Sequence, residues 1–331
     1  MAASFNLAGI GLVLVLFLDE IFISFSSITP IQRSYSNYGV YDADFVDTKP
    51  NELLFDAYYQ GPSEGFEQIL WGYHDPIGPN MWPYLFADEC AQRRQSPINI
   101  VTARAVRASI PQVILFGYNA RPNKMKAFNN GHIIKFKVKG VQKVPHSMTQ
   151  SDATSYDIED IHFHWGSHNF QGSEHTLDGR RFAAEMHIVH KLRGKTFSES
   201  AKLNGGVTVL GVFIDVGPDD NPAYEPLIES LQHIIYKNDT HKFMYNYPLR
   251  SLLPSNTKEF MRYEGSLTTP MCDEIVLWTL FRHPVQISWR QIVQLRGLHR
   301  TRRDEMPPLP MTDNWRPTQP LNGRAVYRVG F

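Results

Sequence analysis

The sequence predicts a mainly β domain with a few short helices, spanning about residues 66–331. Short runs of alternating apolar and polar residues recur along this part of the chain, and a period of two is typical of half-buried strands. Glycine, proline, asparagine and aspartate separate these runs, as turns require. Few stretches have the spacing of an amphipathic helix, so strands dominate the prediction.

The expected elements follow in chain order. The strands are predicted from HIIKFKVKG at 132–140, DIHFHW at 160–165, AAEMHIVHKL at 183–192, VTVLGVFIDVG at 207–217 and EIVLWTLF at 274–281. The best helix candidates are YEPLIESLQHII at 224–235 and SWRQIVQLRGL at 288–298. No internal repeat is visible, which favours one domain.

The first 65 residues differ in character from this domain. Residues 1–27 have the features of a secretory signal, because the apolar run Leu7–Leu18 is too short to cross a bilayer and suits a signal core. Ser26 and Ser27 are a candidate cleavage zone. No basic residue precedes the apolar run, so an uncleaved, membrane-associated N-terminus is the alternative. Residues 28–65 are predicted to form an extended arm or pro-segment.

Composition and motifs exclude several function classes. The chain has 33 basic and 33 acidic residues, and this balance argues against a nucleic-acid partner. It lacks the GxSxG turn of α/β-hydrolases and the glycine-rich loops of nucleotide-binding proteins.

Histidine clustering points to a metal site. Six of the 13 histidines lie between His162 and His190. On a strand, His162 and His164 point to one face, and the run at 183–192 places Glu185 and His187 on one face. If the two strands are neighbours, three imidazoles meet as in a catalytic zinc site, with a carboxylate to hold one of them. A histidine pair on one strand without any metal is the alternative.

Several motifs together resemble the α-class carbonic anhydrases. The match runs from about Trp71 to Arg324 in the family's order. It is carried by WGY at 71, GPNMW at 78, RRQSPINI at 93, NNGH at 129, IHFHWGS at 161, QGSEHTLDGRRFAAEMHIVH at 171, YEGSLTTP at 263 and DNWRPTQPLNGR at 313. The resemblance implies a single domain built on a large twisted, mostly antiparallel sheet with short peripheral helices. It also implies reversible hydration of carbon dioxide to bicarbonate and a proton.

The resemblance assigns a role to each site residue. His162, His164 and His187 match the ligands of a Zn²⁺ ion, whose bound hydroxide attacks carbon dioxide. Thr268 matches the hydroxyl that accepts a hydrogen bond from this hydroxide, and Glu174 matches the carboxylate that orients Thr268.

Proton transfer and substrate binding are assigned in the same way. His132 matches the proton shuttle, and Tyr73 and Asn130 match polar groups of its water network. The wall that holds carbon dioxide matches Val189, Val209, Leu267, Val276 and Trp278, and Thr269 matches a group at the bicarbonate site.

Three further positions bear on the cellular compartment. Two cysteines in a secreted chain suggest one disulfide, with two buried thiols as the alternative. Cys90 and Cys272 match the disulfide of secreted family members. Asn238, in NDT, is a candidate glycosylation acceptor. The expected location is therefore extracellular.

The sequence also departs from the active members of the family. Asp160 stands where they usually have glutamine, and strand alternation lets it accept the second N–H of His162. YKND at 236–239 and the last part of the chain resemble the inactive carbonic-anhydrase-related proteins. The alternative function is thus a secreted or cell-surface module that binds a partner, and the sequence leaves the oligomeric state open.

Overall fold

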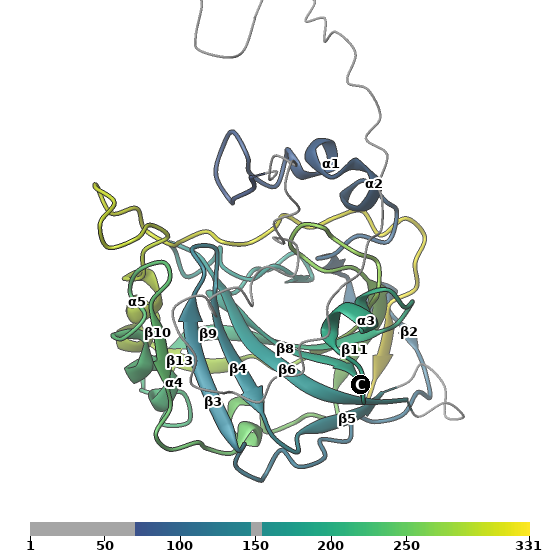
Figure 1. Cartoon of the computed structure of the whole chain (residues 1–331). Helices are drawn as coiled ribbons and strands as arrows, with labels where there is room; N and C mark the ends of the chain where they lie inside the picture. Colours follow the sequence, from purple (N-terminus) through teal and green to yellow (C-terminus); the bar gives the residue numbers. More distant parts are fainter. Residues whose placement is uncertain (1–69, 147–153) are drawn as a thin grey trace, which may run out of the picture. The chain divides into compact units, whose positions relative to one another are not determined.

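A sheet of twelve strands organises the chain (Figure 1). The structure is a computed structural model that describes residues 70–146 and 154–331. The chain divides into two units, 1–46 and 47–331, and every described residue belongs to the second. The expected signal at 1–27 and arm at 28–65 lie outside the described residues.

The strands are short except at the centre of the sheet. In chain order they are β1 (Asn99–Ile100), β2 (Val106–Arg107), β3 (Lys124–Asn129), β4 (Ile134–Lys139), β5 (Lys143–His146), β6 (Thr154–Trp165), β7 (Thr176–Leu177), β8 (Ala184–Leu192), β9 (Val207–Gly217), β10 (Thr240–Lys242), β11 (Phe260–Gly265), β12 (Val276–Phe281), β13 (Val285–Ser288) and β14 (Tyr327–Val329).

The helices are few and short, as predicted. They are α1 (Trp82–Leu85), α2 (Ala87–Cys90), α3 (Phe197–Ala201), α4 (Glu225–Leu231) and α5 (Trp289–Arg296), with 3₁₀ turns η2 (Thr102–Arg104) and η3 (Leu249–Leu252). A capping box at Ser288 begins α5, because its hydroxyl accepts from the Gln291 N–H while the Gln291 side chain accepts from the Ser288 N–H. Within 70–146 and 154–331, none of the helices has the length and hydropathy that crossing a bilayer requires.

Strand order confirms the mainly β, mostly antiparallel prediction. The path through the sheet is β10-β3-β4-β6-β8-β9-β12-β11-β14-β2, with β5 added to β6 and β13 to β9. Within this sheet, as far as the described residues show, parallel pairing is confined to β12 with β9, β13 with β9 and β14 with β2, and β1 and β7 form a separate parallel pair. The five predicted strands correspond to β4, β6, β8, β9 and β12, and the two predicted helices to α4 and α5. Both helices end earlier than the sequence pattern does.

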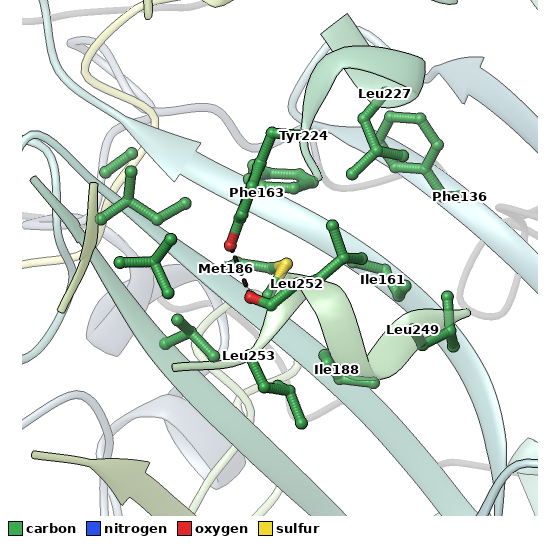
Figure 2. Packing of buried hydrophobic residues seen from close by; sticks show 14 of the residues in the cluster. Phe136, Ile161, Phe163, Met186, Ile188, Tyr224, Leu227, Leu249, Leu252 and Leu253 are labelled. Atoms are coloured by element: carbon green, nitrogen blue, oxygen red, sulfur yellow. Dashed lines mark hydrogen bonds between the residues drawn. The ribbon is translucent and has the colours of Figure 1, made fainter. Parts of the chain in front are cut away.

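The two faces of the central strands bury different groups. On β6, Ile161, Phe163 and Trp165 point into the larger hydrophobic cluster, while the histidines between them point to the opposite face. Figure 2 shows Ile161 and Phe163 packed with residues of α4 and η3. There the Tyr224 hydroxyl donates to the Leu252 carbonyl at 2.8 Å, so the one polar atom on this aromatic side chain is satisfied inside the core.

A disulfide joins two distant segments beside the sheet. Cys90, at the end of α2, is bonded to Cys272, which lies 182 residues further along the chain. Both cysteines pack with Trp82 and Phe86 in a small buried cluster. The Cys272 N–H donates to the Thr269 carbonyl at 2.7 Å, so the disulfide fixes the turn that carries the expected catalytic threonine.

We expect the double substitution Cys90→Ala/Cys272→Ala to lower the free energy of unfolding by about 5 kcal/mol. The estimate follows from the chain entropy of a loop of this length in the unfolded state, a model whose mechanism is disputed. Denaturant titration of the oxidised parent and the variant measures the difference, and peptide mapping without reductant verifies the bond. Equal unfolding free energies for the two proteins would contradict the expectation.

Candidate metal centre and active site

Three imidazoles converge at the middle of the sheet. His162 and His164 lie on β6 and His187 lies on β8, and the antiparallel register pairs His162 directly with His187. The His162 side chain is 13% exposed, whereas those of His164 and His187 are essentially buried. The structure therefore brings together the three residues that the sequence singled out.

Carboxylates hold the outer nitrogens of two of these rings. His162 Nδ1 lies 2.9 Å from Asp160 Oδ1, and His187 Nε2 lies 2.8 Å from Glu185 Oε1. A carboxylate only accepts hydrogen bonds, so each ring donates its N–H outward. In the neutral form of each ring, the inner nitrogens, His162 Nε2 and His187 Nδ1, then carry lone pairs.

The third ring is held by the backbone. His164 Nδ1 donates to the Asn314 carbonyl at 2.8 Å. Its other nitrogen, Nε2, is buried and has no hydrogen-bond partner among the described residues. A buried imidazole nitrogen without a partner is costly, which is an argument for a ligand at this position.

The inner nitrogens have the spacing that a small cation needs. All three lie within 4.8 Å of one another, and His162 Nε2 is 3.2 Å from His187 Nδ1. Zn–N bonds of 2.0–2.1 Å at tetrahedral angles would separate two ligand nitrogens by about 3.3 Å. Two lone pairs facing each other at this distance repel unless a positive charge lies between them. The residues present therefore fit a tetrahedral metal ion.

Burial keeps the rings of His162 and His164 ready to bind a metal at neutral pH. Burial lowers the pKa of His162 to about 3, although the neighbouring Asp160 acts in the opposite direction. Burial also lowers the pKa of His164, against the influence of Glu174. A metal need not displace a proton from these rings near neutral pH, because imidazole binds a metal in its neutral form.

A second group of possible ligands, His175, Glu185 and His187, is better explained as a hydrogen-bond network. Glu185 Oε1 accepts from His175 Nδ1 at 2.7 Å as well as from His187, and Oε2 accepts from the His175 N–H at 2.8 Å. His175 Nε2 then accepts from the Tyr263 hydroxyl at 2.6 Å. Burial alone would raise the pKa of Glu185, but His175 and His187 hold it well below its usual value.

Asp160 is balanced by lysines of the neighbouring strand. Lys135 and Lys137 of β4 stand opposite His162 and Asp160 in the register. Lys137 Nζ lies 3.9 Å from Asp160 Oδ2. Burial would raise the pKa of Asp160, but Lys135, the hydrogen bond to His162 and Lys137 lower it far below its ordinary value. The carboxylate is therefore ionised, and its charge is partly compensated.

Glu174 lies next to the three-histidine cluster. Its Oε1 accepts from the Arg316 N–H at 2.9 Å, and its Oε2 is 3.4 Å from His164 Nε2. Within the described residues Oε2 has no hydrogen-bond partner, and no hydrogen bond joins Glu174 to Thr268. Thr268 is buried, with 5% of its surface exposed. That Glu174 orients Thr268 stays a prediction.

The predicted carbon dioxide wall forms one apolar cluster. Val189 of β8, Val209 of β9 and Val276 and Trp278 of β12 are buried together, and Leu267 packs against them. The Trp278 ring centroid is 4.8 Å from that of His187, so the cluster borders the three histidines. Thr269, the expected bicarbonate contact, is half-buried in the adjacent turn.

His132 lies flat on a tryptophan. Its ring stacks on Trp71 with centroids 4.0 Å apart and planes 12° apart. The Asn130 side chain accepts from the His132 and Ile133 N–H groups at 2.8 Å each, and so holds the turn that presents the ring. The Tyr73 hydroxyl is buried without a partner among the described residues, and burial raises its pKa well above the usual value, with Glu174 adding to the effect.

Asn238 is exposed, and its glycosylation stays a prediction. Sequence reasoning missed the supporting roles of His175, Lys135 and Trp71, and of the Asn314 carbonyl. The period-two pattern of β4 places Lys135 on the same face as Lys137. The sequence pattern alone does not place Lys135 near His162, because that contact depends on the pairing of β4 with β6.

The fold and the site together define a candidate metalloenzyme with three histidine ligands on adjacent strands, a pattern known from catalytic zinc sites. A model of the eukaryotic-type carbonic anhydrase family matches residues 77–330. Carbonic anhydrase 12 of Homo sapiens is 37% identical over 263 residues, which cover 78% of this chain and 72% of the relative. Carbonic anhydrase 4 of Mus musculus is 37% identical over 256 residues, which cover 76% of this chain and 79% of the relative. Carbonic anhydrase 7 of Mus musculus is 36% identical over 258 residues, which cover 77% of this chain and 96% of the relative.

The chain belongs to the eukaryotic-type carbonic anhydrase family, as its motifs predicted. It is accordingly a carbonic anhydrase, with carbon dioxide and bicarbonate as its small-molecule substrates.

Proposed function

We propose that this carbonic anhydrase depends on Zn²⁺ held by His162, His164 and His187. The observation that carries the proposal is the buried, unpartnered His164 Nε2 within 4.8 Å of two further lone-pair nitrogens. When bound, a Zn²⁺ ion lowers the pKa of a coordinated water and so supplies a nucleophile near neutral pH, an effect for which carbonic anhydrases are the reference example. Asp160 and Glu185 fix the orientation of the ligand rings.

The apolar cluster around Trp278 binds carbon dioxide. An uncharged, apolar molecule gains by leaving water for such a surface, whereas bicarbonate does not. Val189 and Val276 therefore favour the substrate over the charged product. Thr269, half-buried beside this surface, is the polar contact for bicarbonate.

Thr268 orients the nucleophile, and Glu174 in turn orients Thr268. A carboxylate oxygen that accepts from the Thr268 hydroxyl would fix this hydroxyl as a donor toward Glu174 and leave its own oxygen as an acceptor toward the nucleophile. The free Glu174 Oε2 has the capacity for this bond.

His132 carries the proton away from the centre. In its stacked position, burial together with Lys237, Arg300 and Lys135 lowers the pKa of His132 to about 4. A shuttle works best with a pKa near the operating pH. The ring therefore needs a more hydrated position, away from Trp71, to accept a proton efficiently.

We infer an extracellular location from the apolar run Leu7–Leu18 and the Cys90–Cys272 bond, because disulfides persist in oxidising compartments. The alternative function, a partner-binding module without activity, is not favoured by any feature of the site.

Zinc analysis combined with a hydration assay tests the proposal. The purified parent should contain about one zinc per chain and hydrate carbon dioxide. His164→Ala should lose metal and activity together, because the deepest of the three ligands is removed. His283→Ala, which alters an exposed histidine outside the site, is the matched control and should keep both. Full activity in a preparation without metal would overturn the zinc assignment.

His132→Ala should slow turnover at saturating carbon dioxide in dilute buffer by about tenfold or more, since a positioned proton carrier is lost. Small imidazole buffers should restore part of the rate by carrying the proton from solution. His168→Ala removes an exposed histidine and serves as the control. If the His132 variant turns over like the parent in dilute buffer, another group is the main shuttle.

Asp160→Gln should shift the pH–rate profile of hydration to lower pH. The carboxylate makes His162 more electron-rich and adds negative charge near the metal, and both effects weaken the acidity of the bound water. Lys135→Met should shift the profile in the opposite direction, because it removes compensating positive charge. Asp157→Asn, on the same strand, is the control. Zinc affinity should change by no more than about 10–100-fold, and a profile that stays in place or moves to higher pH in Asp160→Gln would refute the charge argument.

A further inference from the structure

The turn that presents His132 packs between two other segments of the chain. The Asn129 side chain donates to the carbonyls of Ile235 and His299 at 3.2 and 3.0 Å. The Asn238 N–H donates to the Asn129 carbonyl at 2.8 Å, and the Lys237 N–H donates to the Thr301 carbonyl at 2.9 Å. These bonds fix the segments 235–238 and 299–301 against the turn.

Each of these segments brings a cation close to His132. A Cβ atom added at Gly131, the preceding residue, would lie 2.7 Å from Lys237 Cδ and 3.1 Å from the Arg300 carbonyl oxygen. Lys237 and Arg300 are both half-buried. The charged groups with the largest effects on His132 are Lys237, Arg300 and Lys135, all of them positive.

Lys237 and Arg300 have no anionic partner of their own. In the described part of the chain, neither side chain forms an ion pair or a hydrogen bond, and the buried Arg300 Nε lacks any partner. Nearby acidic groups are otherwise engaged: Asp239 pairs with Arg303 at 3.1 Å, and Asp313 accepts from the Ser167 N–H at 2.9 Å. Two uncompensated cations beside a proton carrier attract small anions to that place.

We propose that Lys237 and Arg300 bind a dianionic oxoanion, of the hydrogenphosphate class, that takes the proton from His132. This inference rests on the proposed function of His132 as the shuttle. The N–H bond of the imidazolium breaks, its electron pair returns to the ring nitrogen, and an O–H bond forms on hydrogenphosphate, giving dihydrogenphosphate and neutral imidazole. The product carries one negative charge fewer, so the two cations hold it less tightly and it leaves.

The same cations would not favour a neutral buffer base. Imidazole bases become positively charged when they accept the proton, and Lys237 and Arg300 repel that product. The structure therefore predicts that this enzyme discriminates between proton acceptors by charge, although both kinds reach the same shuttle.

The test is the dependence of the maximal hydration rate on buffer concentration at constant ionic strength, with phosphate and 1-methylimidazole compared at one pH. In the parent, the hydration rate should reach half of its maximum at a clearly lower concentration of phosphate than of 1-methylimidazole. Sulfate, which cannot accept the proton near neutral pH, should compete with phosphate.

Lys237→Met/Arg300→Met should raise the half-saturating phosphate concentration by about tenfold, a loss typical of two partly exposed charge contacts. The substitutions also raise the basicity of His132, which affects both buffers, so the ratio of the two half-saturating concentrations is the quantity to compare.

Two controls separate local from general charge effects. Lys237→Arg keeps the charge and should keep the parent ratio. Arg193→Met/Lys195→Met removes the same net charge from the exposed turn that follows β8, six to eight residues beyond His187 in the chain, and should also keep it. An unchanged ratio in Lys237→Met/Arg300→Met, or an equal change in the control pair, would overturn the inference.

A binding readout keeps this inference distinct from the proposed function. In the zinc-loaded protein with labelled histidine, phosphate and sulfate should shift the NMR signal of the His132 ring, identified by its absence in His132→Ala. The shift should be lost in Lys237→Met/Arg300→Met. A parent that shows this shift but no hydration would contradict the proposed function alone, whereas an active parent whose His132 signal ignores phosphate would contradict the oxoanion site alone.

Discussion

The antiparallel pairing of β6 with β8 is the constraint on which the rest of the site depends. Side chains on a strand alternate between faces, so one register places three imidazoles on one side of the sheet and Ile161, Phe163 and Met186 on the other. A slip of one residue would exchange the two sets and bury the histidines in the hydrophobic core. The apolar face therefore selects the register, and the register assembles the three histidines proposed to bind the metal.

Burying so many polar groups at the centre of a sheet is tolerated because nearly all of them are paired. Glu185 accepts three hydrogen bonds from His175 and His187. The hydrogen-bond network continues from His175 to the Tyr263 hydroxyl, which lies 2.8 Å from the Ser96 hydroxyl. A fully satisfied network of this kind is rigid, because moving one member leaves another buried group without a partner. Among the described residues that lack such a partner, His164 Nε2 and Glu174 Oε2 lie next to each other at the three-histidine cluster, where a bound ion and its water would use them.

Local patterns in the sequence predicted the strands, because alternation and turn residues are properties of short segments. The HxH spacing of His162 and His164 needed only strand geometry. The participation of His187 needed the further assumption that two strands are neighbours, which the register supplies. The partners that come from distant parts of the chain, such as the Asn314 carbonyl on His164 and Trp71 beneath His132, have no local signal, since main-chain acceptors and aromatic stacking depend on tertiary packing alone. Helix ends were overestimated because the apolar pattern of 224–235 continues beyond Leu231 into turns that are also buried at Ile234.

Charge is distributed unevenly between the three-histidine cluster and His132, the proposed shuttle. Asp160, Glu174 and Glu185 lie at the histidine cluster, and Lys237 and Arg300 lie at His132. Under the proposed function, the protein's own side chains thus oppose a proton that moves from the first region to the second, and the effect of such charges is strongest where burial excludes water. Lys135 reduces this difference in charge because it partly compensates the negative charge of Asp160. A dianion bound by Lys237 and Arg300 would reduce the same difference by compensating the positive charge at His132. The proposed route of proton export thus depends on counter-charges at both of its ends as well as on the basicity of His132.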